Sequence, residues 1–375
     1  MINPTVDNII VFWVTFIHLI FLVIVISNYI YSKKTNRILL NNSYQPGVDI
    51  LIPARNEEKN IKNLVNSILR SDYRNYSIFI LDDNSNDRTK IIVEELEKEY
   101  SNLKLIEGKP LPDGWLGKNW ACHQLSLKAG NDYLLFMDAD VTISPDSISI
   151  AISIMNNKEA DLLSIFPSQK VGTFGEALVV PLMDWLLLTF LPLQKVYKSP
   201  KRSLSAANGQ FMLFRTEAYK KSGGHEKLKG KIVEDIEFAR SLKSIYKRVV
   251  ILPGNNKVNC RMYNGFPEAV SGFVKNLYPG FGINPILYTI IMMLITTLFL
   301  FPFVLMFFSY NSILTTTIIL IQRFFSSLIS KQNPVINILL FPFHIMILAY
   351  ISIRSLILTK QNKVIWKDRS INQIA

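Results

Sequence analysis

The chain has 375 residues, of which 49% are hydrophobic, and it carries a formal net charge of +12. Its mean hydropathy of +0.22 is higher than one ordinary soluble domain requires, so the composition predicts a soluble domain combined with membrane segments. The two cysteines, Cys122 and Cys260, exclude a framework of several disulfides and a C-x-x-C metal site, and they fit a reducing compartment.

An apolar segment at residues 8–31 is long enough for a helix to cross about 30 Å of hydrocarbon. Its basic residues, Lys33, Lys34 and Arg37, come after the apolar run, and no A-x-A cleavage pattern follows it. We therefore interpret the segment as a retained transmembrane anchor rather than a secretory signal. Because basic residues favour the cytoplasmic side, the following domain is predicted to be cytoplasmic, in a multi-pass protein of the cell membrane.

Residues 46–282 alternate charged and apolar stretches, as a globular catalytic domain does. Short apolar runs typical of buried strands lie at 48–52, 78–81, 103–106 and 133–137. Between them, apolar residues recur at helical spacing from Ile61 and from Ile92 onward. Strands that alternate with helices predict an α/β fold with a doubly wound, mainly parallel sheet.

Acidic and polar residues follow three of these predicted strands, in the turns PARNEE, DDNSND and DAD. In such sheets ligands bind outside the carboxyl ends of the strands. We interpret Asp87, near the start of the second helix, as a helix cap. Asp138 and Asp140 differ, because two carboxylates one residue apart repel each other unless a cation or a donor lies between them. The pair suits a divalent cation that binds a diphosphate, so Mg²⁺ or Mn²⁺ is the predicted cofactor.

Further apolar segments follow the first one. The segment at about 176–196 contains Pro181, Asp184 and Pro192, and we expect it to lie on the membrane surface and to line the acceptor entry. Residues 268–278 form a second predicted interfacial helix. A C-terminal transmembrane bundle at 284–359 has predicted segments at 286–308, 312–330 and 335–358, followed by a basic tail at 360–375.

The topology of this bundle stays open at the level of sequence. Three crossings that start in the cytoplasm would place the tail outside, yet its basic residues favour the inside. Arg323, within the middle segment, argues against a simple span, because a charge inside a membrane is costly and usually functional.

The positive charge has three possible interpretations: a nucleic-acid site, an anionic membrane surface, or a solvated face. Basic residues cluster at Lys195, Lys198, Lys201, Arg202, Lys220, Lys221, Lys227, Lys229 and Lys231. Because membrane segments flank the domain, we predict an anionic lipid surface as the partner and no nucleic acid.

Five motifs in order resemble those of family 2 glycosyltransferases: VDILIPARNEEKNI, ILDDNSNDRT, WLGKNWAC, LLFMDADVTISPD and VEDIEFARSLK. The later stretches NGQFMLFRTEAYKKSGGHE, CRMYNGFPEAVSGFVKNLYPG and VIWKDR resemble a membrane-bound subgroup that includes staphylococcal carotenoid-acid glucosyltransferases and hopanoid-associated glycosyltransferases. This resemblance implies a GT-A type fold with a Rossmann-like nucleotide-binding half, and an inverting, metal-dependent transfer. The chain lacks the Q-x-x-R-W motif of processive synthases, which disfavours a polysaccharide polymerase.

The resemblance also implies roles for residues on the donor side. Pro53, Arg55 and Glu57 match the segment along the base and ribose, and Asp83 matches the residue that accepts a hydrogen bond from uracil. A carboxylate suits a pyrimidine N–H donor, so a UDP-sugar is the first candidate donor and a GDP-sugar the second. Asp138, Ala139 and Asp140 match the diphosphate and metal segment, with Asp138 and Asp140 as metal ligands. Lys118 follows two glycines and can neutralise phosphate, although a surface lysine beside a turn has the same pattern.

Inversion needs a base that takes a proton from the acceptor. Asp235 matches the family's catalytic base, while local sequence alone would describe Glu234 and Asp235 as an acidic pair at a helix N-terminus. Asn208, Gly209, Glu234 and Arg261 match acceptor-side positions. His225 follows two glycines and fits either a ligand contact or a structural turn.

The leading hypothesis is an inverting glycosyltransferase that moves a sugar, with glucose as first candidate, from a UDP-sugar to a lipid acceptor in the bilayer. A carotenoid acid or related terpenoid is the acceptor that the resemblance implies. The alternatives are a polyprenyl-phosphate or ceramide glycosyltransferase and, in a different class, a membrane scaffold that binds a nucleotide sugar without turnover.

Overall fold

The computed structural model describes residues 4–35, 45–361, 363, 365–366 and 369–370. The chain divides into two compact units, which are described separately. The sheet unit consists mainly of residues 34–168 and 195–261, and the helical unit of residues 1–33, 169–194 and 262–372. Arg37 and most of the predicted basic tail at 360–375 lie outside the described residues.

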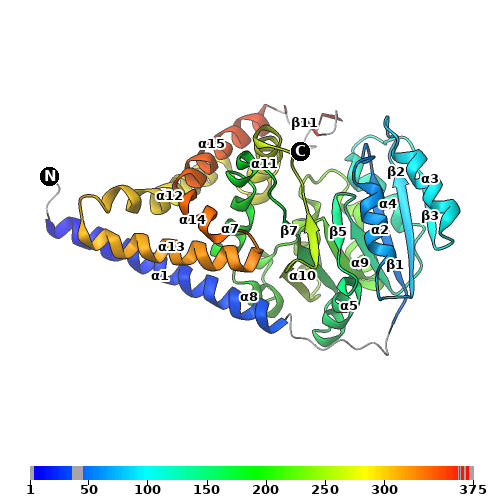
Figure 1. Ribbon diagram of the computed structural model, residues 1–375, viewed down its shortest axis with the longest axis horizontal. Helices are drawn as coiled ribbons and strands as arrows, with labels where there is room; N and C mark the ends of the chain where they lie inside the picture. Colours follow the sequence, from blue (N-terminus) through cyan, green and yellow to red (C-terminus); the bar gives the residue numbers. More distant parts are fainter. Residues whose placement is uncertain (1–3, 36–44, 362, 364, 367–368, 371–375) are drawn as a thin grey trace. The chain divides into compact units, whose positions relative to one another are not determined.

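The sheet unit is built on a seven-stranded sheet with the strand order β3-β2-β1-β4-β8-β6-β9. Three of these strands, β1, β2 and β3, are labelled in Figure 1. The strands are β1 (Val48–Ala54), β2 (Tyr76–Asp82), β3 (Leu103–Glu107), β4 (Tyr133–Met137), β6 (Leu162–Phe166), β8 (Phe211–Arg215) and β9 (Val249–Pro253). β8 runs antiparallel to its neighbours β4 and β6, and the other pairs are parallel. The predicted α/β class with a mainly parallel sheet is therefore confirmed.

The central strand β1 illustrates why these residues form a buried parallel sheet. Ile50 and Leu51 are both fully buried although they point to opposite faces, so both faces of the strand are covered. Asp49 is an exception in this apolar run, and its carboxylate is satisfied by the N–H groups of Gly130 and Asn131, each at 2.8 Å. These bonds tie the start of β1 to the turn that precedes β4.

Helices and a small second sheet complete this unit. The helices are α2 (Ile61–Leu69), α3 (Thr89–Glu99), α4 (Gly117–Ser126), α5 (Ser147–Asn157), α8 (Leu193–Lys198), α9 (Thr216–Ser222) and α10 (Glu234–Ser244), with 3-10 turns η1 (Arg202–Leu204) and η2 (His225–Leu228). The second sheet has the order β5-β10-β7, from β5 (Val141–Ile143), β10 (Val258–Cys260) and β7 (Ser168–Gln169). Its register places Cys260 opposite Val141, directly after the DAD turn.

The helical unit contains α1 (Pro4–Thr35), α6 (Phe174–Ala177), α7 (Pro181–Phe190), α11 (Phe266–Phe281), α12 (Pro285–Leu305), α13 (Tyr310–Ser330), α14 (Pro334–Leu339) and α15 (Phe341–Lys360), and a hairpin of β11 (Ile365–Trp366) and β12 (Arg369–Ser370). Within the described residues, four helices are long and apolar enough to cross a membrane: the segment Ile9–Thr35 of α1, then α12, α13 and α15. The predicted third C-terminal segment, 335–358, is two helices rather than one, because the chain turns between α14 and α15.

The boundary of the predicted catalytic domain, 46–282, differs from the observed division, which places residues 169–194 and 262–282 in the helical unit. The reason is apolar packing within that unit. Trp185 of α7 is 1% exposed, and its ring lies 4.8 Å from that of Phe299 and 5.4 Å from that of Phe341. Buried residues of α11 belong to the same apolar core. An interfacial location of 176–196 stays a prediction.

Arg323 lies inside the helical unit and is 1% exposed. Its guanidinium lies 3.4 Å from Nδ1 of His344 and donates to the carbonyl of Pro181 at 3.5 Å. Burial of the Arg323 charge costs free energy, and these polar partners within the same unit reduce that cost.

Candidate active site

The carboxyl ends of β1 and β2 lie side by side and form the first part of the candidate site. The register pairs Pro53 with Leu81, and the N–H of Asp83 donates to the carbonyl of Ala54 at 2.8 Å. The guanidinium of Arg55 donates to the carbonyl oxygen of Asp83 at 2.7 Å. Arg55 and Asp83, which were predicted to contact the nucleoside, are thus brought together at one edge of the sheet.

The turn after Arg55 is joined to the start of α3. The N–H of Glu57 donates to Oγ1 of Thr89 at 2.8 Å. The carboxylate of Asp87 accepts the N–H of Thr89 at 2.9 Å and that of Glu58 at 3.1 Å. Thr89 is the first residue of α3 and Arg88 is its N-cap residue, so Asp87 satisfies the first backbone N–H of the helix from the position before the cap.

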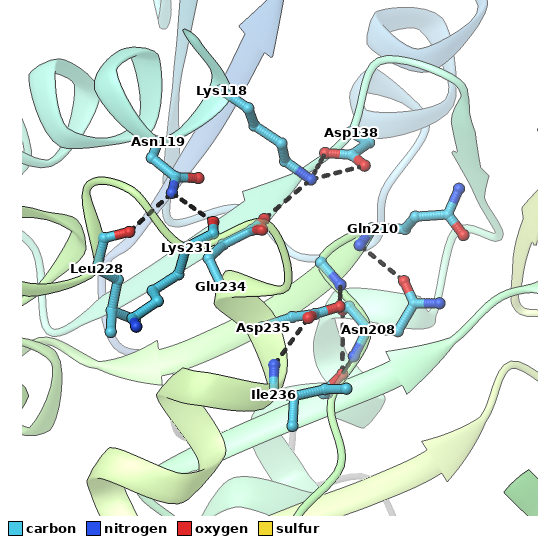
Figure 2. Close-up of polar contacts among 12 residues, drawn as sticks. Lys118, Asn119, Asp138, Asn208, Gln210, Leu228, Lys231, Glu234, Asp235 and Ile236 are labelled. Carbon is cyan, nitrogen blue, oxygen red and sulfur yellow. Dashed lines mark hydrogen bonds and ion pairs between the residues drawn. The ribbon is translucent and has the colours of Figure 1, made fainter. Parts of the chain in front are cut away.

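Lys118 lies between two carboxylates that come from distant parts of the chain (Figure 2). Its ammonium is 2.8 Å from Oδ1 of Asp138 and 3.4 Å from Oε1 of Glu234. Burial would lower the pKa of Lys118, but the charges of Asp138 and Glu234 raise it well above its ordinary value. Lys118 is therefore a permanent cation, and the three side chains are 23%, 27% and 9% exposed, so solvent screens them only in part.

Gly209 makes the close approach of these groups possible. A Cβ atom at this position would lie 3.0 Å from Nζ of Lys118 and 3.3 Å from Oε1 of Glu234. The turn around it is fixed by Asn208, whose N–H donates to Oγ of Ser164 at 2.7 Å and whose Oδ1 accepts the N–H of Gln210 at 2.8 Å. Asn208 and Gly209, predicted on the acceptor side, therefore form one wall of the acidic cluster.

Asp235 is the second residue of α10, and its carboxylate is held by backbone groups. Oδ2 accepts the N–H of Gly209 at 3.0 Å, and Oδ1 accepts the N–H of Ile236 at 2.7 Å. Burial, and next the charge of Glu234, raise the pKa of Asp235 to about 7. Glu234 is paired with Lys118 whereas Asp235 has no ion pair among the described residues, so the two neighbouring acids have different environments.

Asp140 is contacted by two buried side chains. The amide Nε2 of Gln210 donates to Oδ1 of Asp140 at 3.3 Å and to Sγ of Cys260 at 2.9 Å. Burial raises the pKa of Asp140 to about 6, and the negative charges of Asp138 and Glu57 act in the same direction. The repulsion that the D-x-D spacing predicts is thus present in the structure.

Sequence reasoning placed Gln210 on the acceptor side, but it did not predict the contacts of Gln210 and Cys260 with Asp140. Both lie next to recognised positions, Gln210 beside Gly209 and Cys260 beside Arg261. Their proximity to Asp140 depends on strand pairings that no local pattern reveals. Arg261 itself directly follows β10 and is exposed, and Ala139 is buried between the two aspartates.

His225 lies in a buried aromatic cluster. Its Nδ1 is 2.8 Å from the hydroxyl of Tyr219, and its ring lies 4.9 Å from that of Phe136 and 4.8 Å from that of Phe238. Burial lowers the pKa of His225 well below its ordinary value, so the imidazole is neutral. This environment favours the structural interpretation over a ligand contact.

Asn119 connects the helix of Lys118 to the loop that precedes α10 (Figure 2). Its amide Nδ2 donates to the carbonyls of Leu228 at 2.9 Å, Lys229 at 3.3 Å and Lys231 at 3.0 Å. Asn119 is 1% exposed. The exposed residues Lys227, Lys229 and Lys231 lie in the segment before α10, which Asn119 holds next to the acidic cluster.

No group of three or more His, Cys, Asp and Glu side chains with the geometry of a metal site occurs in the described part of the chain. A cation held by one or two carboxylates and by substrate phosphates does not need such a group. Asp138 and Asp140 offer the oxygen ligands that Mg²⁺ and Mn²⁺ prefer.

Comparison with known proteins agrees with this site. Residues 49–223 match the model of glycosyl transferase family 2. The matched range contains the predicted donor-side residues and the D-x-D turn, and ends before α10. The resemblance drawn from the motifs is therefore confirmed.

Within the family, the chain is similar to the 4,4'-diaponeurosporenoate glycosyltransferases. It is 28% identical to the protein of that name from Staphylococcus haemolyticus over 236 residues, which are 62% of this chain and 61% of that protein. It is 29% identical to the one from Staphylococcus aureus strain MRSA252 over 247 residues, which are 64% of this chain and 63% of that protein. The match thus spans less than two thirds of these relatives' length.

A solved structure extends the likeness of fold over most of the chain. The mannosyltransferase PcManGT from Pyrobaculum calidifontis, in complex with GDP-Man and Mn²⁺, covers 92% of this chain and 98% of its own, with a TM-score of 0.55 and 14% sequence identity. At this identity the likeness concerns the fold, and it agrees with the GT-A type architecture that the motifs implied.

Proposed function

We propose that the protein is an inverting glycosyltransferase that moves a sugar from a UDP-sugar to a lipid acceptor in the bilayer. Glucose is the first candidate sugar because of the motif resemblance. A carotenoid acid or related terpenoid is the first candidate acceptor, as the names of the relatives suggest. The observation that carries the proposal is Asp235, a carboxyl group with a pKa of about 7, held by two backbone amides beside the cluster of Lys118, Asp138 and Glu234. A base with this pKa is matched to proton transfer near neutral pH.

The donor-side residues support a nucleotide at the ends of β1 and β2. In this proposal Pro53, Arg55 and Glu57 lie along the base and ribose, and the carboxylate of Asp83 accepts the uracil N–H. A GDP-sugar is the second candidate, because the fold neighbour was solved with GDP-Man. Competitive binding of UDP and GDP to the purified protein tells which nucleotide it prefers, and so distinguishes a UDP-sugar from a GDP-sugar donor.

Asp138 and Asp140 are the proposed ligands of Mg²⁺ or Mn²⁺. The donor set fits such an ion, because both side chains are carboxylates. Burial, and next the charges of Asp138 and Glu57, raise the pKa of Asp140, and a cation bound there would relieve this repulsion. When bound, the ion would neutralise negative charge on the departing diphosphate. Lys118 supplies a second positive charge to the same group.

The chain's own residues then account for the transfer. The oxygen of the acceptor forms a bond to the anomeric carbon while the bond from that carbon to the diphosphate oxygen breaks, which inverts the configuration. If the acceptor is a hydroxyl group, Asp235 takes its proton. Glu234 is held by Lys118 and lies on the acceptor side with Asn208, Gly209 and Arg261.

The membrane setting is part of the proposal. The basic residues Lys33 and Lys34 at the end of α1 favour the cytoplasmic side for the sheet unit, and the four apolar helices favour a multi-pass location in the cell membrane. All nine basic residues of the two clusters between Lys195 and Lys231 are exposed, which suits contact with anionic lipid.

Radiolabelled UDP-glucose mixed with the full chain and with extracted lipids tests this function. We expect label in a lipid fraction, and we expect Asp140→Ala to reduce the transfer at least tenfold. Asp235→Asn should reduce it as much if the acceptor is a hydroxyl group, and much less if the acceptor is a carboxyl group. Asp132→Asn is the matched control, because Asp132 is exposed and directly precedes β4, at the end of the strand opposite to Asp138. Unaltered transfer by both site variants would refute the site, and UDP binding without any transfer would favour the scaffold.

A further inference from the structure

Two buried side chains, those of Gln210 and Cys260, hydrogen-bond to the carboxylate of Asp140. Gln210, which is 3% exposed, donates from one amide nitrogen to Asp140 at 3.3 Å and to the sulfur of Cys260 at 2.9 Å. Cys260, which is 2% exposed, also hydrogen-bonds to Asp140. Asp140, Gln210 and Cys260 therefore form a closed triangle of polar contacts.

The triangle is assembled by strand pairing from three separate parts of the chain. β4 pairs with β8 so that Met137 lies opposite Phe211, and the N–H of Asp138 donates to the carbonyl of Gln210 at 3.3 Å. On the other side of the turn, β5 pairs with β10 so that Val141 lies opposite Cys260. Asp140 therefore lies between two donors: Gln210, which directly precedes β8 of the large sheet, and Cys260, which ends β10 of the small sheet.

We propose that Gln210 and Cys260 are positioning residues that orient Asp140 for the divalent cation, an inference that rests on the proposed metal role of Asp140. An ionised carboxylate has roughly four lone-pair sites, so two donors fix its plane and leave sites for a cation. Mutation of a group that hydrogen-bonds to a metal ligand typically lowers metal affinity by about 10- to 100-fold.

The chemistry of the thiol suits a donor role. A thiol can donate its hydrogen to the carboxylate of Asp140 while its sulfur accepts from Gln210. A serine hydroxyl can make the same two contacts, whereas an alanine methyl group can make neither.

The test measures Mn²⁺ binding by the full chain in micelles at saturating UDP, from the loss of the free-ion signal in electron paramagnetic resonance. Gln210→Met removes both donated bonds at nearly constant volume, and Cys260→Ala removes the thiol. We expect each to weaken Mn²⁺ binding by about 10- to 100-fold. Cys260→Ser should restore most of the affinity, and Cys122→Ala, which truncates the other buried thiol, should leave it within about twofold.

Two further measurements separate positioning from general stability. Binding of UDP without metal and the thermal transition should change little in the two variants, since a loss of packing alone would lower all three quantities together. Unchanged Mn²⁺ affinity in both variants would overturn the inference, provided that Asp140→Ala abolishes binding. If Asp140→Ala also leaves Mn²⁺ affinity unchanged, the metal site itself is wrong, and both this inference and the proposed metal role fall.

Discussion

The dependence of transfer on the ionisation of Asp235 is the sharpest prediction of the proposed mechanism. With a pKa of about 7, the group is roughly one tenth ionised at pH 6 and roughly nine tenths ionised at pH 8. If Asp235 removes a proton from a hydroxyl acceptor, kcat/KM should therefore rise by about tenfold between these pH values. Asp235→Asn should remove this dependence and lower the rate by about 10²- to 10⁴-fold, the usual contribution of a general base.

A carboxyl acceptor should behave differently, because its own pKa is about 4 and it carries no proton to remove at pH 6 to 8. For such an acceptor we expect no rise in rate with pH and a much smaller effect of Asp235→Asn. The assay compares two lipids of the same skeleton, one ending in an alcohol and one in an acid, at saturating donor and metal.

An equal loss with both lipids, or a rate with the alcohol that is flat from pH 6 to 8, would refute the assignment of Asp235 as the base. Glu234→Gln serves as the neighbouring control. It removes a charge next to Asp235 and should shift the profile to lower pH without removing it, because the charge of Glu234 raises the pKa of Asp235.

Three further predictions concern the charges and hydrogen bonds of the site. Lys118→Met should weaken binding of UDP with Mn²⁺ by at least tenfold, measured by calorimetry, yet strengthen binding of Mn²⁺ alone, because Asp138 loses its ammonium partner. In metal-free protein, the pKa of Asp235 is raised in the folded state from 3.8 to about 7, so its contribution to stability is complete below pH 4 and is lost as the pH rises through 7. Chemical unfolding at pH 5 and pH 8 should show Asp235→Asn gaining stability relative to the parent protein at the higher pH, by at most about 3 kcal/mol. Asn119→Ala removes a side-chain donor from three carbonyls, of which those of Leu228 and Lys229 keep a backbone N–H donor. It should lower the free energy of unfolding by about 1–3 kcal/mol, with Asn102→Ala, in the turn before β3, as the comparison.

The sequence was sufficient for the parts of the fold that depend on local pattern. The apolar runs that predict β1, β2, β3 and β4 are short, bounded by polar turns and followed by helical spacing, and all four strands lie where expected. The D-x-D turn was equally visible, because its meaning depends only on two residues and on the strand before them. Four apolar helices were recognisable by length and composition.

The remaining features depend on contacts between distant residues. The apolar run that contains Trp185 has the same composition whatever surrounds it, and the packing of Trp185 against Phe299 and Phe341 depends on residues far along the chain. Glu234 and Asp235 are equivalent to any local argument, and they differ only because Lys118 pairs with the first while backbone amides hold the second. Gln210 and Cys260 reach Asp140 only because of two strand pairings, β4 with β8 and β5 with β10.

Charge balance gives these contacts a common explanation. Asp138, Asp140, Glu234 and Asp235 come together around one internal cation, Lys118, and two of the four have raised pKa values as a result of burial and of one another's charge. A diphosphate brought in alone would add to this negative charge, whereas a diphosphate with a divalent cation would relieve it. The arrangement therefore favours binding of donor and metal together over binding of either alone. In the protein alone, hydrogen bonds stabilise the two carboxylates with raised pKa values: Asp235 accepts from the N–H of Gly209, and Asp140 accepts from the amide of Gln210.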